Sequence, residues 1–226
     1  MATYVVRVWL ADRPGALGAV ASRIGSVGGD LTGIEILERG AGRAIDELVV
    51  TLPDPGLVGL LIDEISQVDG VAVEDVRPIE RVARDPRLDA LETAAVLVEQ
   101  RSVPGLLEAL AVHSQHDFEA AWCSVIDLDG PVPLATVGEA PPAPWLGAFV
   151  AGSQTSIRVA AGECGPDDVA WAVLQTADLA IVLGRNGRPF RGRERQQLSA
   201  LARIADSRWS ELVLRSARIA HPSAAS

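Results

Sequence analysis

Hydrophobic and polar residues follow two periods in the first eighty residues, one typical of strands and one of helices. Residues 4–10 are rich in β-branched and aromatic side chains and lead into Asp12-Arg-Pro-Gly15, which predicts a strand ending in a turn. Apolar residues then recur three and four apart, which predicts a helix over 14–27 with Pro14 at its first helical position. The same patterns predict strands over 31–38 and 44–52, a helix over 57–68 and a strand over 71–76.

The resulting βαββαβ order predicts a ferredoxin-like unit over residues 1–80, in which both helices cover one face of a four-stranded antiparallel sheet. The other face is then left uncovered. Alternation along the first strand places Val5, Arg7 and an exposed Trp9 on that face. Residues 81–87 form a charged stretch with a proline and are interpreted as a linker.

A second unit is predicted over residues 88–218, followed by a disordered tail over 219–226. The apolar patterns predict helices over 88–100, 104–111 and 190–216, strands over 120–128, 132–137, 157–161, 169–175 and 179–183, and a loop over 141–144. Both units mix helices with strands, so the fold class is α/β in the broad sense, of the α+β type.

Composition narrows the possible partners and the compartment. The 226 residues carry a net charge of −10, which argues against nucleic acid or an anionic membrane as partner. Hydrophobic runs fall short of the roughly 20 residues that span a bilayer, and no secretory leader is recognised, so we expect a soluble, cytoplasmic protein. Cys123 and Cys164 are too few for a disulfide framework and are expected to be reduced.

The turn between the first strand and the first helix offers chemistry for a small charged ligand. Amides at a helix start have no partner within the helix, so they can hold an anion such as a carboxylate. Gly15 allows close approach to the backbone, and Asp12 is placed to pair with an ammonium group. The simpler interpretation is that Asp12 only supports the helix start and Gly15 only makes a tight turn, because helix starts of this kind are common.

Asp12-Arg-Pro-Gly-Ala-Leu17, with Gly28-Gly-Asp-Leu31 opening the second strand, resembles the ACT domain, a regulatory amino-acid-binding module. The resemblance covers residues 3 to about 80 and implies a homodimer whose ligand lies between this turn and the second-strand start of a neighbouring copy. The ligand-binding residues it implies are Asp12, Arg13, Pro14, Gly15, Ala16, Leu17, Asp30, Leu31 and Thr32. Many relatives have Asn in place of Asp30, and the extra acid favours a ligand with an ammonium group, or a metal ion.

The second unit resembles a GAF domain over roughly residues 85–215. The likeness rests on the order of its elements and on Gly184-Arg-Asn-Gly-Arg-Pro-Phe190, Glu194 and Leu198-Ser-Ala-Leu-Ala202. The resemblance implies an antiparallel sheet with terminal helices, a small-molecule pocket between sheet and loops, and dimerisation through the terminal helices. No chromophore- or haem-binding signature is recognised, so no cofactor is assigned.

Catalytic and metal-binding motifs are not recognised. The sequence shows no Walker loop, nucleophile elbow or HExxH helix, and three histidines leave little for general-base chemistry, so we expect no enzymatic activity and assign no catalytic residue. No metal ligands are assigned. The arginines at 185, 188, 191, 193 and 195 either bind a phosphate or an acidic partner, or form a solvated helix start.

These observations predict a non-catalytic regulatory protein that binds an amino acid or similar small metabolite as an allosteric sensor. Two alternatives stay open. One is a ligand-free interaction module that regulates a separate enzyme or transcription factor through its sheet edges or its Arg-rich helix. The other is an enzyme fragment whose catalytic domain lies on another chain.

Overall fold

The computed structural model describes residues 1–79, 86–130, 132–156, 166 and 168–220. The chain divides into two compact units, residues 1–84 and 85–226. Among the residues described, no helix is both long and apolar enough to cross a membrane.

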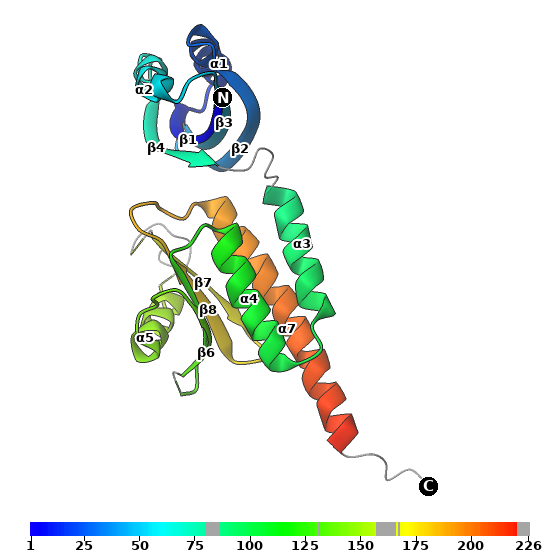
Figure 1. The fold of residues 1–226 in the computed structure, drawn as a ribbon. Helices are drawn as coiled ribbons and strands as arrows, with labels where there is room; N and C mark the ends of the chain where they lie inside the picture. The colour runs from blue at the N-terminus through cyan, green and yellow to red at the C-terminus, as the bar shows by residue number, and fades with distance from the viewer. Residues whose placement is uncertain (80–85, 131, 157–165, 167, 221–226) are drawn as a thin grey trace. The chain divides into compact units, whose positions relative to one another are not determined.

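The first unit has the predicted βαββαβ order. Its elements are β1 (Ala2–Ala11), α1 (Ala16–Ser26), β2 (Asp30–Gly40), β3 (Arg43–Leu52), the 3-10 turn η1 (Pro55–Leu57), α2 (Val58–Ser66) and β4 (Ala72–Ile79). The strands pair antiparallel in the order β2-β3-β1-β4, and both helices lie on one face of the sheet (Figure 1). The ferredoxin-like prediction is confirmed.

The helix-facing side of this sheet forms the core of the first unit. Strand alternation directs every second side chain of β1 and β3 towards α1 and α2, whose own apolar residues recur at helical spacing. The buried members of the cluster are Val6, Val8, Leu10, Val20, Ile24, Ala44, Leu48, Val50, Leu52, Leu61 and Ile65. Burial of these side chains fixes the register, because a shift of one residue would turn the whole set to the other face.

The start of α1 differs from its prediction. The helix begins at Ala16, so Pro14 precedes it instead of occupying its first helical position. Gly15 stands between them with φ +87°, in the left-handed region that side chains other than glycine rarely adopt. Because the left-handed conformation of Gly15 is not helical, the helix can begin only after Gly15. Pro14 therefore lies in the turn before the helix.

The sheet face away from the helices is not the open apolar surface expected from the sequence. Arg7 is fully buried there, and Val5 is buried as well. Glu47 Oε1 accepts hydrogen bonds from Arg7 Nε and Nη2 at 3.0 and 2.8 Å, and from Arg77 at 2.9 Å. The expectation of an exposed Trp9 is wrong. Trp9 is half-buried. Its indole N–H donates to Glu74 Oε1 at 3.1 Å, and the guanidinium of Arg43 lies over its ring.

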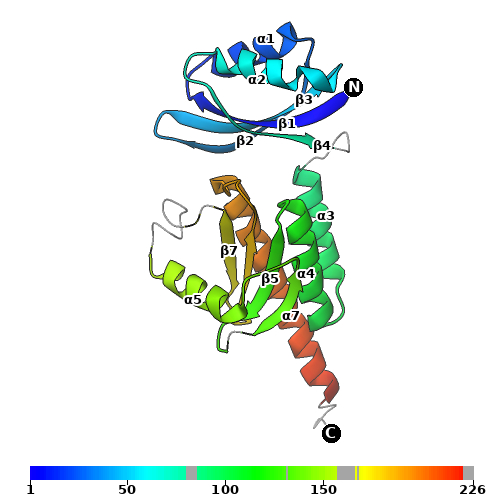
Figure 2. The ribbon, with the colours of Figure 1, turned by 60° about the vertical axis from the view of Figure 1, so that its left-hand side comes forward.

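The second unit is an antiparallel four-stranded sheet between unequal helical layers. Its elements are α3 (Pro86–Glu99), α4 (Val103–Asp117), β5 (Trp122–Asp127), β6 (Pro133–Val137), α5 (Ala143–Gln154), β7 (Val169–Leu174), β8 (Leu179–Gly184) and α7 (Gly192–Ala220). The strand order is β6-β5-β8-β7. Helices α3, α4 and α7 lie on one side of the sheet and α5 on the other (Figure 2).

The second unit departs from its prediction at the start of α5, and several predicted segments lie outside the described residues. The stretch 141–144 was predicted as a loop, but α5 begins at Ala143, because Pro144 suits the first turn of a helix and Leu146 and Val150 bury its inner face. The strand predicted over 157–161 and most of the tail predicted over 219–226 lie outside the described residues. The predicted linker over 81–87 also lies largely outside them, and α3 begins at Pro86.

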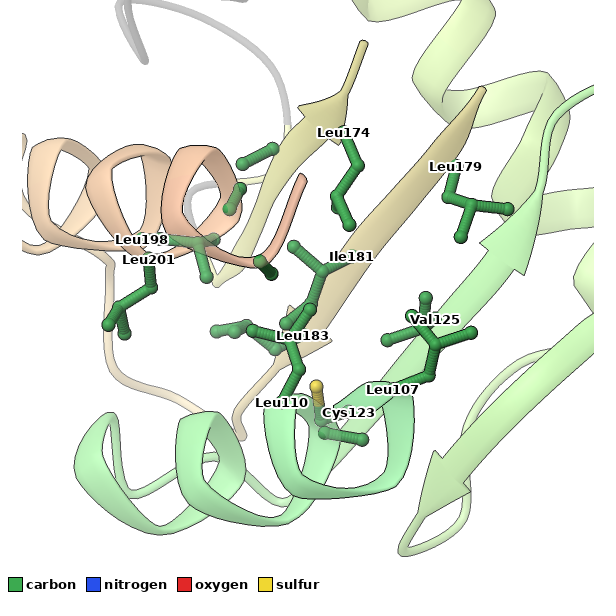
Figure 3. Packing of buried hydrophobic residues seen from close by; sticks show 14 of the residues in the cluster. Leu107, Leu110, Cys123, Val125, Leu174, Leu179, Ile181, Leu183, Leu198 and Leu201 are labelled. Atoms are coloured by element: carbon green, nitrogen blue, oxygen red, sulfur yellow. The ribbon is translucent and has the colours of Figure 1, made fainter. Parts of the chain in front are cut away.

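The main core of the second unit is apolar and lies between the sheet and α4 and α7 (Figure 3). Cys123 lies in this core, fully buried, and burial raises the pKa of its thiol. As a free cysteine without access to solvent it has the structural role predicted for it. Cys164 lies outside the described residues.

Candidate functional site

The turn from β1 into α1 is held against the β2–β3 hairpin. The Asp12 N–H donates to the Gly42 carbonyl at 2.9 Å, and the Ala16 N–H donates to the Arg13 carbonyl at 3.3 Å. These bonds fix the path of the backbone through the turn. The side chains of residues 12–14 are exposed around it.

The backbone at the start of α1 presents unbonded amides. Within the part of the chain that the structure describes, the N–H groups of Gly15, Leu17 and Gly18 have no hydrogen-bond acceptor. A Cβ placed on Gly15 would meet no atom within 4 Å, so the space beside this residue is open. The amides and the positive end of the helix dipole make this spot favourable for a carboxylate.

Asp12 does not cap the helix. The N-cap position is Gly15, and no side chain accepts a hydrogen bond from the first turn. The Asp12 carboxylate is exposed and has no hydrogen bond or ion pair to any described residue. The interpretation that Asp12 only supports the helix start is therefore wrong, whereas Gly15 does make a turn that needs glycine.

The other residues of the turn have mixed environments. Arg13 lies 3.6 Å from Asp69 in an ion pair that is exposed on both sides, so it stays available to another anion. Ala16 is buried and Leu17 is partly packed into the core below α1. The Leu17 amide, and not either side chain, can reach a ligand, because the Ala16 amide already donates to Arg13.

The second group of predicted site residues lies at the far end of the same sheet. Asp30 pairs with Thr51, and Thr51 in turn pairs with Thr3 at the beginning of β1, whereas the turn follows the end of β1. Leu31 is partly packed into the core, and Thr32 donates to the Val49 carbonyl at 3.3 Å. One chain therefore does not bring Asp30, Leu31 and Thr32 together with residues 12–17.

One buried acid near the turn was missed by the sequence analysis. Asp46 lies on β3 opposite Val8, on the helix-facing side, and is only 4% exposed. Burial raises the pKa of its carboxyl group; Arg39 opposes this effect, and the negative charge of Asp12 adds to it. The available signal was the alternation of Ala44, Asp46 and Leu48, which places a charged residue at a core position.

The arginines at the start of α7 fit neither of the two roles considered for them. Arg185 is 4% exposed, pairs with Glu194 and stacks on Phe190, with its guanidinium carbon 3.8 Å from the ring centroid. Arg188 pairs with Glu119 at 2.9 Å. These side chains join the start of α7 to neighbouring elements, so they are neither a free phosphate site nor a solvated face.

The described residues contain no group of three or more His, Cys, Asp or Glu side chains arranged to hold a metal ion. The face of the second sheet that α5 covers is lined by apolar residues, among them Trp122, Leu146, Trp171 and Val182.

Comparison with known proteins gives structural likenesses only. No family model and no curated protein matches the chain. The ACT domain of a GTP pyrophosphokinase from Chlorobium tepidum has 16% identity and a TM-score of 0.29, covering 35% of this chain and 100% of that one. An ACT domain protein from Streptococcus pneumoniae has 16% identity and a TM-score of 0.30, covering 36% of this chain and 98% of that one.

A bacteriophytochrome from R. palustris has 10% identity and a TM-score of 0.40, covering 83% of this chain and 45% of that one. These likenesses fit an ACT-type fold in the first unit and a GAF-like fold in the second. At such scores they carry nothing about ligand, activity or partner.

Proposed function

We propose that the protein is a non-catalytic, cytoplasmic regulatory protein whose first unit binds an amino acid or a closely similar metabolite at the β1–α1 turn. The ligand's carboxylate binds the unbonded amides of Gly15, Leu17 and Gly18, and its ammonium group lies towards the acidic side chain of Asp12. The resemblance of the Asp12–Leu17 segment to ACT domains supports the same class of ligand.

The observation that carries this proposal is the pairing of opposite charges in one open turn. A left-handed glycine leaves space beside three amides with no acceptor, and the unpaired carboxylate of Asp12 belongs to the residue three positions before that glycine. An anion alone would be repelled by Asp12, and a cation alone would leave the amides unused. A zwitterion satisfies both.

A homodimer completes the site. Asp30, Leu31 and Thr32 lie at the opposite end of the sheet from the turn, so they reach a ligand there only from a second copy. The edge strand β2 exposes 47% of Ile34 and 37% of Ile36 on its helix-facing side, and such an edge favours pairing with another strand. A ligand that binds one arrangement of the dimer more tightly shifts the population towards that arrangement. This shift is the regulatory output of the site.

The test is a thermal-shift panel of the twenty common amino acids with the full chain, followed by titration of each amino acid that raises Tm. Asp12→Ala should weaken binding of such a ligand roughly tenfold, because it removes a charge-assisted hydrogen bond. Its Tm without ligand should match the wild type, since Asp12 neither caps the helix nor pairs. Asp63→Ala, an exposed acid on α2, is the matched control and should bind normally.

A flat panel would favour the second candidate, a ligand-free interaction module. One observation supports that candidate: the second unit exposes apolar side chains along its terminal helices. Those on α3 and α7 are Leu88, Leu91, Val98, Val213 and Leu214, with exposures between 37% and 68%. Apolar rows of this kind mark surfaces that pack against another chain.

A further inference from the structure

Asp46 occupies a core position of the first sheet. On β3 it lies between Ala44 and Leu48, which belong to the apolar core, and its neighbours across the ladder are Val8 on β1 and Ile36 on β2. Directly opposed side chains in an antiparallel pair share a face. The carboxylate therefore lies on the side covered by the helices.

The Asp46 carboxylate has no partner in the described part of the chain. Its Oδ1 atom is buried and accepts no hydrogen bond, and no ion pair reaches the side chain. Nearby cations do not supply one: Arg39 acts on it only through its field, and Arg23 of α1 pairs with Glu64 at 2.8 Å. A side chain that is only 4% exposed thus has an unsatisfied acceptor.

An unpartnered buried carboxylate lowers stability, because ionisation in a core is costly and the lost hydration is not replaced. The raised pKa of Asp46 reflects the same cost. A buried acceptor without a partner in a native structure needs a specific explanation, and a ligand that supplies the missing donor is one. The cross-strand neighbour of Asp46 on the edge strand, Ile36, is 37% exposed, so Asp46 lies next to a part of the sheet that the helices leave uncovered.

The surrounding charges define the missing partner. Asp12 is the second acid whose field acts on Asp46, so the surroundings of Asp46 are negative, while the start of α1 offers unbonded amides. Two acids are too few for a calcium or magnesium site, which needs six or more oxygen ligands. An ammonium group needs only one or two carboxylates and donates up to three hydrogen bonds.

We propose that Asp46 binds the ammonium group of the amino acid whose carboxylate is held by the amides at the start of α1. This inference rests on the proposed function, and it names the residue that selects an amine-bearing ligand. Asp46 makes the stronger contact, because its carboxylate is shielded from water, and the exposed Asp12 makes the weaker one.

The test uses Asp46→Asn in the full chain, which keeps the shape of the side chain and removes its charge. We expect the variant to lose roughly tenfold or more in affinity for each amino acid that stabilises the wild type. Affinity for the matched carboxylic acid without the amino group should stay within about twofold. Without ligand, Tm should rise by roughly 4 °C. Asp63→Asn on α2 is the control and should change neither measurement.

The outcomes separate the two proposals. If no amino acid shifts the wild-type Tm, the proposed function is wrong and the inference falls with it. If amino acids bind the wild type and Asp46→Asn equally, the function stands and the inference is overturned. Equal losses for the amino acid and its amine-free analogue also overturn it, because they indicate a distorted site and not a lost ammonium contact.

Discussion

Two neighbouring acids on β3, Asp46 and Glu47, face opposite sides of the same sheet and have opposite environments. Glu47 accepts hydrogen bonds from Arg7 and Arg77, and its side chain is 13% exposed. Asp46 is buried more deeply among apolar residues, yet its Oδ1 accepts none. A buried charge that is fully bonded serves the fold, whereas one that is left unbonded calls for a functional explanation.

The pKa values of the two acids move in opposite directions because cations outweigh burial at only one of them. Burial raises the pKa of both carboxyl groups, and for Asp46 this effect prevails over Arg39. For Glu47 the positive charges of Arg77 and Arg7 outweigh burial and lower the pKa below its usual value. What separates the two faces is therefore the supply of cations, not the depth of burial.

The largest expected effect comes from removing Arg7, which pairs with Glu47 on the sheet face away from the helices. Arg7→Met should lower the free energy of unfolding of the first unit by about 3 kcal/mol, because it leaves Glu47 buried with one cation fewer. Urea unfolding of the full chain, with hydrogen exchange at the amides of β1 and β3, measures this unit separately from the second.

Arg23→Met provides the control for this prediction. Arg23 joins α1 to α2 through Glu64 at the same 2.8 Å as the Arg7–Glu47 contact, but its side chain is 42% exposed. It should cost less than about 1 kcal/mol. Equal losses in the two variants would contradict a structural role for the buried network.

The second expected effect is a pair of opposite pH profiles. The pKa of Glu47 is lowered in the folded protein, so its ionised form stabilises the fold above its ordinary pKa, and this contribution is lost as pH falls. Glu47→Gln should lower the free energy of unfolding by about 2 kcal/mol at neutral pH, and less in acid.

The pKa of Asp46 is raised in the folded protein, so the folded state binds the proton more tightly and loses stability as pH rises through this range. Asp46→Asn should therefore gain about 1 kcal/mol at neutral pH, and the gain should vanish as pH falls to the ordinary pKa of an aspartate. Urea unfolding between about pH 7 and about pH 4 tests both variants. Profiles of the same sign would refute the contrast between the two faces.

The sequence predicted the fold of the first unit well because one face of its sheet is regularly apolar. The alternation that places Val6, Val8 and Leu10 on one side is the same alternation that the structure buries. The prediction was wrong at the start of α5, where residues 141–144 contain three prolines. Proline is compatible with both a loop and a first helical turn, so the helix start could not be recognised.

The site was predicted only in part, for a physical reason. Asp12 and Gly15 belong to a local motif that can be read along the chain. The importance of Asp46 depends instead on which face of β3 is buried and on the absence of a described cation in contact with its carboxylate. Arg7 appears as a single charged residue within an apolar strand, and Asp46 appears as one of two adjacent acids within another. Only the register, which places Glu47 opposite Arg7, shows that one is bonded and the other is not.

The smallest expected effect tests whether the β1–α1 turn keeps the left-handed conformation of Gly15 in solution. Gly15 has φ +87° with open space around its Cα, so Gly15→Ala should cost about 1 kcal/mol through backbone strain and not through a clash. Gly18 lies inside α1 with equally open space, so Gly18→Ala should gain about 0.5 kcal/mol from helix propensity. Urea unfolding measures both, and a stabilising Gly15→Ala would mean that the left-handed turn is not kept in solution.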